Sequence, residues 1–314
     1  MSGGTVHAVN KQKGGLLTES RKEKLSLFYK SVGNIANRYR KNVSGVLGLS
    51  ILMFFVIMAV FAPYLANFEN PKSISWADVN PLRESPSSEF WFGTDFYGRD
   101  IWSLTVWGAR ASLIVGLMAS LISIVLGTTV GLLAGYFGKF ADEVLMRFTD
   151  FFLVIPWLPL MIVFAMIMGR SFTNIIIVIG ITSWSSTARI VRAQVLSVKE
   201  KMFIQRARCV GSGDLRIIRK HILPNVVPLI FANTILLIAN SIFSESFLEF
   251  FNLGDPDVIS WGTMLEESYS NGDFNSPAWW DFAAPGACIV ILIMAFYLIG
   301  DALDEVLNPK LRKR

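Results

Sequence analysis

The chain contains 314 residues, of which 53% are hydrophobic and only 17% are charged, and its mean hydropathy is +0.48. Soluble globular domains rarely combine such hydropathy with so few charges, so the composition excludes that class and predicts an all-α polytopic membrane protein. The formal net charge is +5. We interpret it as a signal of membrane topology and expect no nucleic-acid binding, because apolar stretches flank the basic segments.

The N-terminal residues 1–41 are expected to form a basic cytoplasmic tail. They carry nine Lys and Arg against two Glu, and the first 24 are rich in Gly, Ser, Thr and Lys, which is typical of disorder. They lack the short apolar core and cleavage site of a secretory signal, so we expect the first span to remain as an anchor. Residues 42–110 would hold the first transmembrane helix and an external loop, residues 111–306 a five-helix core, and residues 307–314 a basic cytoplasmic tail.

Six stretches are long and apolar enough to cross a bilayer, which needs roughly 20 residues of helix. None of them contains Asp, Glu, Lys or Arg. The sequence therefore predicts six transmembrane helices, at residues 46–65, 111–137, 151–169, 172–188, 226–244 and 282–300.

The charges between these stretches predict the orientation, because Lys and Arg favour cytoplasmic loops. Residues 189–225 carry nine Lys and Arg against two acids, whereas residues 251–281 carry six acids and no Lys or Arg. Both termini and the basic loop are therefore expected in the cytoplasm and the acidic loop outside. The acidic loop could dock a binding protein with a basic rim, or could simply reflect the absence of positive charge outside.

The sequence offers no catalytic constellation, so we expect no catalytic, cofactor-binding or metal-binding residue. It lacks a Walker-type phosphate loop, and its two histidines, His7 and His221, do not assemble with a nucleophile. Cys209 and Cys288 cannot form a disulfide framework. Ion-coupled carriers usually have ionisable residues at mid-membrane, and none lies there. Uphill transport would need energy from a partner.

Residues 205–225, QRARCVGSGDLRIIRKHILPN, form a basic segment between two apolar spans. Residues 199–210 suit a short helix, and Gly211 can adopt the left-handed conformation that closes it. Ser212 is then expected to cap a second helix that ends at Pro224. That helix would carry Leu215, Ile218 and Ile222 on one face. The alternative is an amphipathic segment lying on the membrane surface.

This segment resembles the EAA motif of ABC-importer permeases, E-A-A-x3-G-x9-I-x-L-P. Ala207, Gly211, Leu223 and Pro224 match it, whereas Gln205 and Arg206 replace its usual Glu and Ala. The resemblance implies that the segment docks on a cytoplasmic ATPase and transmits its motion. The coupling residues that it implies are Gln205, Arg206, Ala207, Gly211, Asp214, His221, Leu223 and Pro224.

Further motifs resemble the dipeptide and oligopeptide branch of these permeases. They are FGTDFYGRD at 92–100, GARASL at 108–113, AGYFG at 134–138, Glu245, SWG at 260–262, and GDAL and NPKLR at 300–303 and 308–312. The resemblance implies a prokaryotic inner-membrane subunit that works with a second permease, two ATPases that bind ATP and Mg, and an external solute-binding protein. Peptide is the expected solute, with oligosaccharides and nickel chelates as alternative solutes. The alternative functions for the chain are a stand-alone secondary carrier and a membrane scaffold.

Several of these motif residues also have ordinary structural interpretations. FGTDFYGRD suits a turn in which Asp95 and Asp100 cap helices and Arg99 pairs locally, rather than a solute or calcium site. Glu245 is a candidate for the translocation path, or an exposed carboxylate at a helix end. Trp261 is a candidate external contact, or an interfacial anchor.

Overall fold

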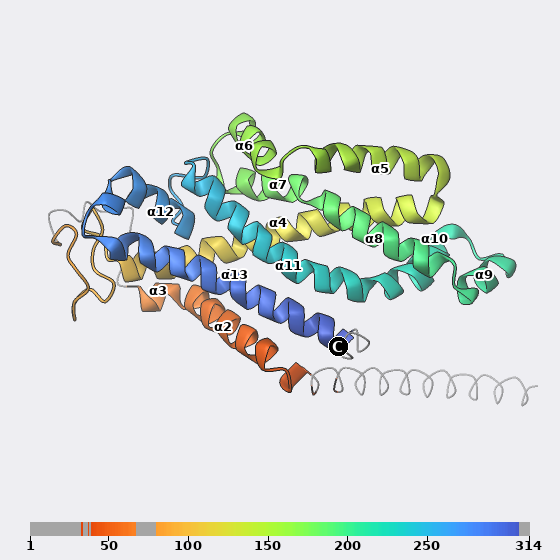
Figure 1. The fold of residues 1–314 in the computed structure, drawn as a ribbon, viewed down its shortest axis with the longest axis horizontal. Coiled ribbons are helices and arrows are strands. Elements are labelled where there is room, and N and C mark those ends of the chain that lie inside the picture. Colours follow the sequence, from red (N-terminus) through yellow and green to blue (C-terminus); the bar gives the residue numbers. More distant parts are fainter. Residues whose placement is uncertain (1–32, 34–36, 38, 67–79, 308–314) are drawn as a thin grey trace, which may run out of the picture.

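The computed structural model describes residues 33, 37, 39–66 and 80–307, and this part of the chain is built from helices (Figure 1). The expected tails at 1–41 and 307–314 lie largely outside the described residues. In chain order the elements are α2 (Val43–Val60), α3 (Ala62–Leu65), α4 (Ile101–Phe137), α5 (Lys139–Val154), α6 (Trp157–Met168), α7 (Phe172–Thr182), α8 (Trp184–Lys199), α9 (Met202–Cys209), α10 (Asp214–Ile217), the π-helical turn η2 (Ile218–Ile222), α11 (Leu223–Phe250), α12 (Trp261–Ser270), the 3₁₀ turn η3 (Asp273–Asn275) and α13 (Trp279–Leu307).

The structure has five helices that are long and apolar enough to cross a membrane, and up to six if one bent pair counts as a span. The sequence predicted a single helix at 151–169, and this prediction was wrong. The structure has the bent pair α5 and α6 there. The two helices meet at 93°. Pro156 lies at the break, where it has no N–H to donate and forces Ile155 into an extended conformation.

Other spans are longer than the apolar stretches that predicted them. The second begins at Ile101 instead of residue 111, because the carboxylate of Asp100 accepts the N–H groups of Trp102 and Ser103 and starts the helix there. The external loop therefore does not reach residue 110 as expected. The fourth span continues through Lys199, interrupted at Ser183 between α7 and α8.

Helix α4 lies at the centre of the bundle and approaches α8 closely along a ladder of glycines. A Cβ added to Gly127 or Gly131 would lie 2.6 Å from the carbonyl oxygen of Trp184 or Ala188, respectively. At Gly135 it would lie 2.8 Å from Cβ of Val195. Small residues at this spacing let two membrane helices pack backbone to backbone. We call Gly127, Gly131 and Gly135 the glycine ladder.

Residues 80–100 fold against α12 and η3 to close the external end. The expected turn is confirmed, and so is the cap at Asp100, but Asp95 caps no helix. Its carboxylate accepts the N–H groups of Tyr97 and Arg99 inside the turn and the Nε of Arg99 at 2.6 Å. Arg99 also pairs with Glu267 of α12, and Arg83 pairs with Asp273.

The charge of Arg99 is therefore balanced inside the external end. Burial alone would lower the pKa of Arg99, but the carboxylates of Asp95 and Glu267 outweigh burial and raise it, so the guanidinium stays protonated. Two of the six acids expected on an exposed outer loop, Glu267 and Asp273, are thus engaged in contacts within the chain.

Candidate functional sites

The first candidate site is the cytoplasmic helix–turn–helix formed by α9 and α10, at the opposite end of the bundle from α12 (Figure 1). Gly211 has a φ of 77°, as predicted. The N–H of Gly211 donates a hydrogen bond to the carbonyl oxygen of Arg208 at 2.9 Å. The N–H of Ser212 donates one to the carbonyl oxygen of Ala207 at 3.1 Å. These two bonds are the Schellman arrangement that closes a helix on a left-handed residue.

The second helix of this element differs from its prediction in three respects. Gly213, not Ser212, stands at the N-cap of α10. Pro224 does not end the helix, because it is the second residue of α11, which directly continues the η2 turn. Ile222 is buried and Ile218 is half-buried, as expected of the apolar face, but Leu215 is 68% exposed and Ile217 is buried in its place.

The consequence is one unbroken helical column. Residues Asp214–Phe250 pass from the cytoplasmic turn through η2 into α11 as a single span of 37 residues. The backbone of α10 is therefore continuous with the apolar part of α11.

The helix–turn–helix is fixed to the foot of the bundle by apolar and polar contacts. Ile204, Ile217 and Ile222 are buried against Val195 of α8 and its neighbours. Tyr136, near the end of α4, donates its hydroxyl to Asp214 at 2.6 Å.

Two cations flank the ring of Tyr136. The side chains of Arg208 and Lys199 lie 5.5 and 5.8 Å from its centroid. Tyr136 is a residue that the sequence analysis did not assign to coupling. Its place in AGYFG, just before the cytoplasmic end of an apolar run, is the signal that could have found it.

The remaining predicted coupling residues lie on α9, on η2 and at the start of α11. Gln205, Arg206 and Pro224 are exposed, and Ala207, His221 and Leu223 are half-buried. Exposed apolar side chains accompany them: Met202, Val210 and Leu215. Large contiguous apolar patches on a surface are typical of contacts with another protein or with a membrane.

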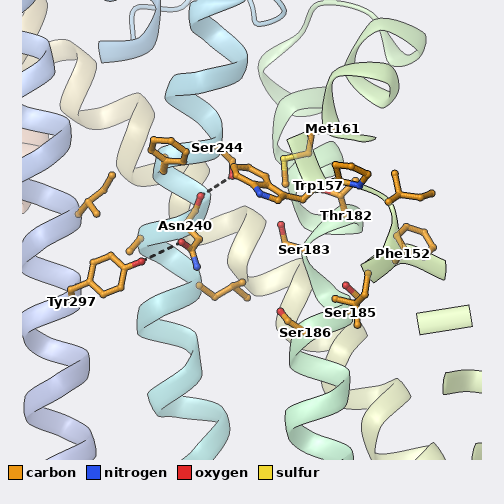
Figure 2. Close-up of a pocket in the computed structure, with 17 residues that line it drawn as sticks. Phe152, Trp157, Met161, Thr182, Ser183, Ser185, Ser186, Asn240, Ser244 and Tyr297 are labelled. Atoms are coloured by element: carbon orange, nitrogen blue, oxygen red, sulfur yellow. Dashed lines mark hydrogen bonds between the residues drawn. The ribbon is translucent and has the colours of Figure 1, made fainter. Parts of the chain in front are cut away.

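The second candidate site is a cavity of about 630 Å³ at the centre of the bundle, shown in Figure 2. Its walls come from the α5–α6 break, the α7–α8 break, α11 and α13. Among the described residues that line it, none is Asp, Glu, Lys or Arg. The polar side chains are hydroxyls and one amide: Thr182, Ser183, Ser185, Ser186, Asn240, Ser244 and Tyr297.

Hydrogen bonds link polar groups of α11 and α13 on one side of this cavity. Tyr297 of α13 donates to Oδ1 of Asn240 at 3.5 Å, and Ser244 donates to the Asn240 carbonyl at 2.8 Å (Figure 2). The aromatic wall is formed by Trp157 and Phe243, whose ring centroids are 6.2 Å apart. Both of these rings and Tyr297 remain nearly half exposed, so the cavity is open on one side.

The sequence analysis did not select these polar residues. Two signals were available: SWSS at residues 183–186, inside an apolar stretch, and the amide of Asn240, one of two in the fifth apolar stretch. A polar residue inside an apolar span is costly unless it has a partner or lines a cavity.

Glu245 and Trp261, the predicted path or external residues, lie elsewhere. Glu245 is fully buried, and its carboxylate accepts from Ser112 of α4 and from Ser246, each at 3.1 Å. The expectation of an exposed carboxylate was wrong. Neither residue is among those lining the cavity in Figure 2.

Trp261 is not an interfacial anchor either. Its side chain is 0% exposed, and its indole N–H donates to the carbonyl of Thr105 at 2.9 Å. Its ring lies against the face of α4 at Gly108, where an added Cβ would be 2.7 Å away. It therefore fixes α12 to α4 in the external core.

A helical bundle with a neutral polar cavity at its centre and a helix–turn–helix at its cytoplasmic end defines a polytopic transport subunit. Residues 127–313 match the family described as binding-protein-dependent transport system inner membrane component, and residues 33–81 match the N-terminal transmembrane domain of oligopeptide transport permease C. The chain belongs to this family of inner-membrane permeases. It is a transport subunit of such a system and contains no ATPase domain.

Characterised relatives cover most of the chain. It is 37% identical to the dipeptide transport system permease protein DppC of Bacillus subtilis, over 88% of this chain and 85% of that protein. It is 34% identical to the oligopeptide transport system permease protein OppC of the same organism, over 88% of each chain. It is 36% identical to the glutathione transport system permease protein GsiD of Pectobacterium atrosepticum, over 87% of this chain and 89% of that protein.

A solved structure shares the fold. The MetNI methionine ABC transporter, in inward-facing conformations, contains a chain that aligns with a TM-score of 0.52 at 19% identity. The alignment covers 66% of this chain and 95% of that one.

Proposed function

We propose that this chain forms half of the peptide pathway of an ATP-driven importer. A second, homologous permease supplies the other half, two ATP-binding subunits dock on the α9–α10 element, and an external binding protein delivers the solute. The observation that supports this most directly is the column Asp214–Phe250, because it carries both sites. Its foot is the predicted docking surface, and its middle places Asn240 and Ser244 in the cavity.

The docking step rests on the surface of the α9–α10 element. Arg206 and the neighbouring exposed apolar side chains project from a short helix that packs on the bundle through Ile204. A groove on an ATPase that closes with ATP would move this element, and the column would transmit the motion to the cavity. Coupling of this kind needs an element with two positions that both sites bias.

The pathway rests on the open, uncharged cavity. A second permease covering its open side would enclose a passage lined by hydroxyl, amide and aromatic groups. Such groups can exchange hydrogen bonds with a peptide backbone without holding it through a fixed charge, so release remains easy. The three relatives named above are permeases for dipeptides, oligopeptides and glutathione, which supports peptide over oligosaccharide or nickel chelate.

The test is purification of the chain from its native membrane in mild detergent, followed by reconstitution. Mass spectrometry should find a second permease and ATP-binding subunits. Proteoliposomes of the complex, supplied with the binding protein, should accumulate alanyl-alanine when ATP is provided on the ATPase side. The variant Arg206→Glu should recover less ATPase, and Arg147→Glu, on the exposed face of α5, should recover the normal amount.

Three results would contradict the proposal. Uptake by the chain alone would support a secondary carrier. Uptake of maltotriose or a nickel–histidine chelate in place of the peptide would reassign the solute. Recovery without any ATPase would remove the docking role from the α9–α10 element.

A further inference from the structure

A second cavity, of about 610 Å³, lies between α2, α4, α11 and α13, on a different face of α11 from Asn240. We call it the α2 groove and define it by Leu49, Val56 and Val60 of α2, Arg110 and Leu117 of α4, and Phe296 of α13. It belongs neither to the central cavity nor to the docking element. Arg110 is also the third residue of GARASL, a motif that the proposed function leaves without a role.

The groove is apolar except at one end. Apart from Arg110, its only polar lining residue is Thr234, whose hydroxyl donates to the carbonyl of Ile230 at 2.8 Å. Arg110 is exposed, and within the described residues its guanidinium contacts the ring of Trp107 at 5.9 Å and has no carboxylate partner. A peptide would find no hydrogen-bonding group along the groove, and an apolar helix would leave the guanidinium unsatisfied.

The groove is long enough to hold an acyl chain, and its polar end lies toward the outside. From Leu49 to Val60 is about 16 Å along a helix, close to half of a hydrocarbon core of about 30 Å. Val60 ends α2, and Arg110 lies in the first third of α4, whose Asp100 end faces outside under the predicted topology. The cation therefore stands at the outer interface, and Trp107 beside it is a side chain typical of that level.

We propose that the α2 groove binds a glycerophospholipid of the outer leaflet. An acyl chain lies along the apolar walls, and the phosphate accepts hydrogen bonds from the guanidinium of Arg110. Arginine suits this role because its planar fork of donors matches a phosphate and carries charge at every physiological pH. A lipid held there would fill the space between α2 and α4 and support the position of the first span. This inference does not depend on the identity of the transported solute.

The test uses the purified importer complex and native mass spectrometry after addition of palmitoyl-oleoyl phosphatidylglycerol or phosphatidylethanolamine. The native complex should retain a bound phospholipid. Arg110→Gln should lower retention about tenfold, the effect of one charge-assisted hydrogen bond. Ile114→Trp fills the groove from its partly exposed wall and should lower retention as well. Arg110→Lys keeps the charge and should retain most binding, and Arg147→Gln, on α5, should not differ from the native chain.

The outcomes separate the alternatives. Retention of phosphatidylglycerol alone would show that a net negative headgroup is required, and retention of both lipids would show that the phosphate suffices; both support the site. Equal retention by the native complex, Arg110→Gln and Ile114→Trp would overturn it. So would efficient cross-linking of Leu117→Cys to another subunit, since that would place protein in the groove. Thermal melting of each variant checks that it remains folded. If Arg110→Gln does not fold, the test relies on Ile114→Trp.

Discussion

Gly211 is held in its left-handed conformation by the backbone alone. No heavy atom lies within 4 Å of a Cβ placed on it, so a side chain there would meet open space and the penalty would come only from φ. For an L-residue that penalty is about 1–2 kcal/mol, and a β-branched side chain adds to it. At position 211 the turn between α9 and α10 therefore depends on whether the residue tolerates a positive φ, and not on the volume of its side chain.

We therefore expect Gly211→Val to impair coupling, with less peptide taken up per ATP hydrolysed by the reconstituted complex. Gly211→Asn should be milder, because Asn tolerates the left-handed region. Gly213→Ala is the matched control: Gly213 also has open space around it but has a φ of −67°. Normal uptake per ATP in Gly211→Val would show that the turn does not transmit motion.

Residues whose role depends on backbone chemistry were predictable, and residues whose role depends on a distant contact were not. Glycine is the residue most compatible with a positive φ, so the conformation of Gly211 could be deduced from its spacing. Trp261 and Glu245 contact α4, more than a hundred residues away in sequence. A single sequence does not show such contacts, so an acid and an indole near a span end were expected at the surface.

At the scale of helices, Tyr136 links the end of α4 to the start of α10. Its hydroxyl bond to Asp214 joins the central helix of the bundle to the column that carries both sites. Hydrogen bonds to charged groups contribute about 1.5–3 kcal/mol, so its loss should loosen α10 from α4 without unfolding either helix.

Tyr136→Phe keeps the ring and its two cations and removes only this bond. We expect ATP hydrolysis to continue while uptake per ATP falls. Asp214→Asn can still accept the bond and should be closer to native, and Tyr64→Phe, at an 85% exposed position on α3, should have no effect. An unchanged ratio of uptake to hydrolysis in Tyr136→Phe would exclude a role for this contact in coupling.

The glycine ladder makes a separate prediction about α4 and α8. Gly131→Ala would place a Cβ 2.6 Å from the carbonyl oxygen of Ala188, which is backbone and cannot rotate away. Overpacking of this kind costs about 1–3 kcal/mol. Gly286→Ala, in α13, meets open space and should gain helix propensity instead. Melting temperatures of the two purified variants should therefore move in opposite directions, and equal shifts would contradict the close approach of α4 and α8.

The helical type of the elements and the place of most spans could be predicted because membrane helices must be long and apolar to satisfy their backbone without water. The break between α5 and α6 was missed for the same reason. Ile155 and Pro156 lie within an apolar run, so hydropathy continued across them while the backbone did not. Pro156 did signal the bend. A proline alone does not predict a break, however, since Pro228 lies inside an unbroken helix.

For the whole molecule, the distribution of charge separates a neutral interior from charged ends. The described residues that line the central cavity include no ionisable acid or base, whereas Arg and Lys gather at the α9–α10 end. A pathway without fixed charge should accept peptides of different net charge and leave the choice of solute to the binding protein.

Asn240→Asp tests this by placing a carboxylate at the centre of the cavity. At an effective dielectric constant of 20, two unit charges 4 Å apart interact with about 4 kcal/mol, so even a partial interaction should change uptake of anionic relative to cationic dipeptides about tenfold. Asn225→Asp, on the exposed cytoplasmic part of α11, is the control. Competition uptake with the two peptide classes measures the ratio. An unchanged ratio would place the solute outside this cavity.

The glycine ladder also limits how this chain can change in length over evolution. One residue inserted into α4 between Gly127 and Gly135 would rotate everything beyond it by about 100° about the helix axis. The later glycines would then face away from α8, and larger side chains would take their places against its backbone. Homologous permeases should therefore vary in length in their loops and keep an identical residue count across this stretch. An alignment of many of them can test that directly.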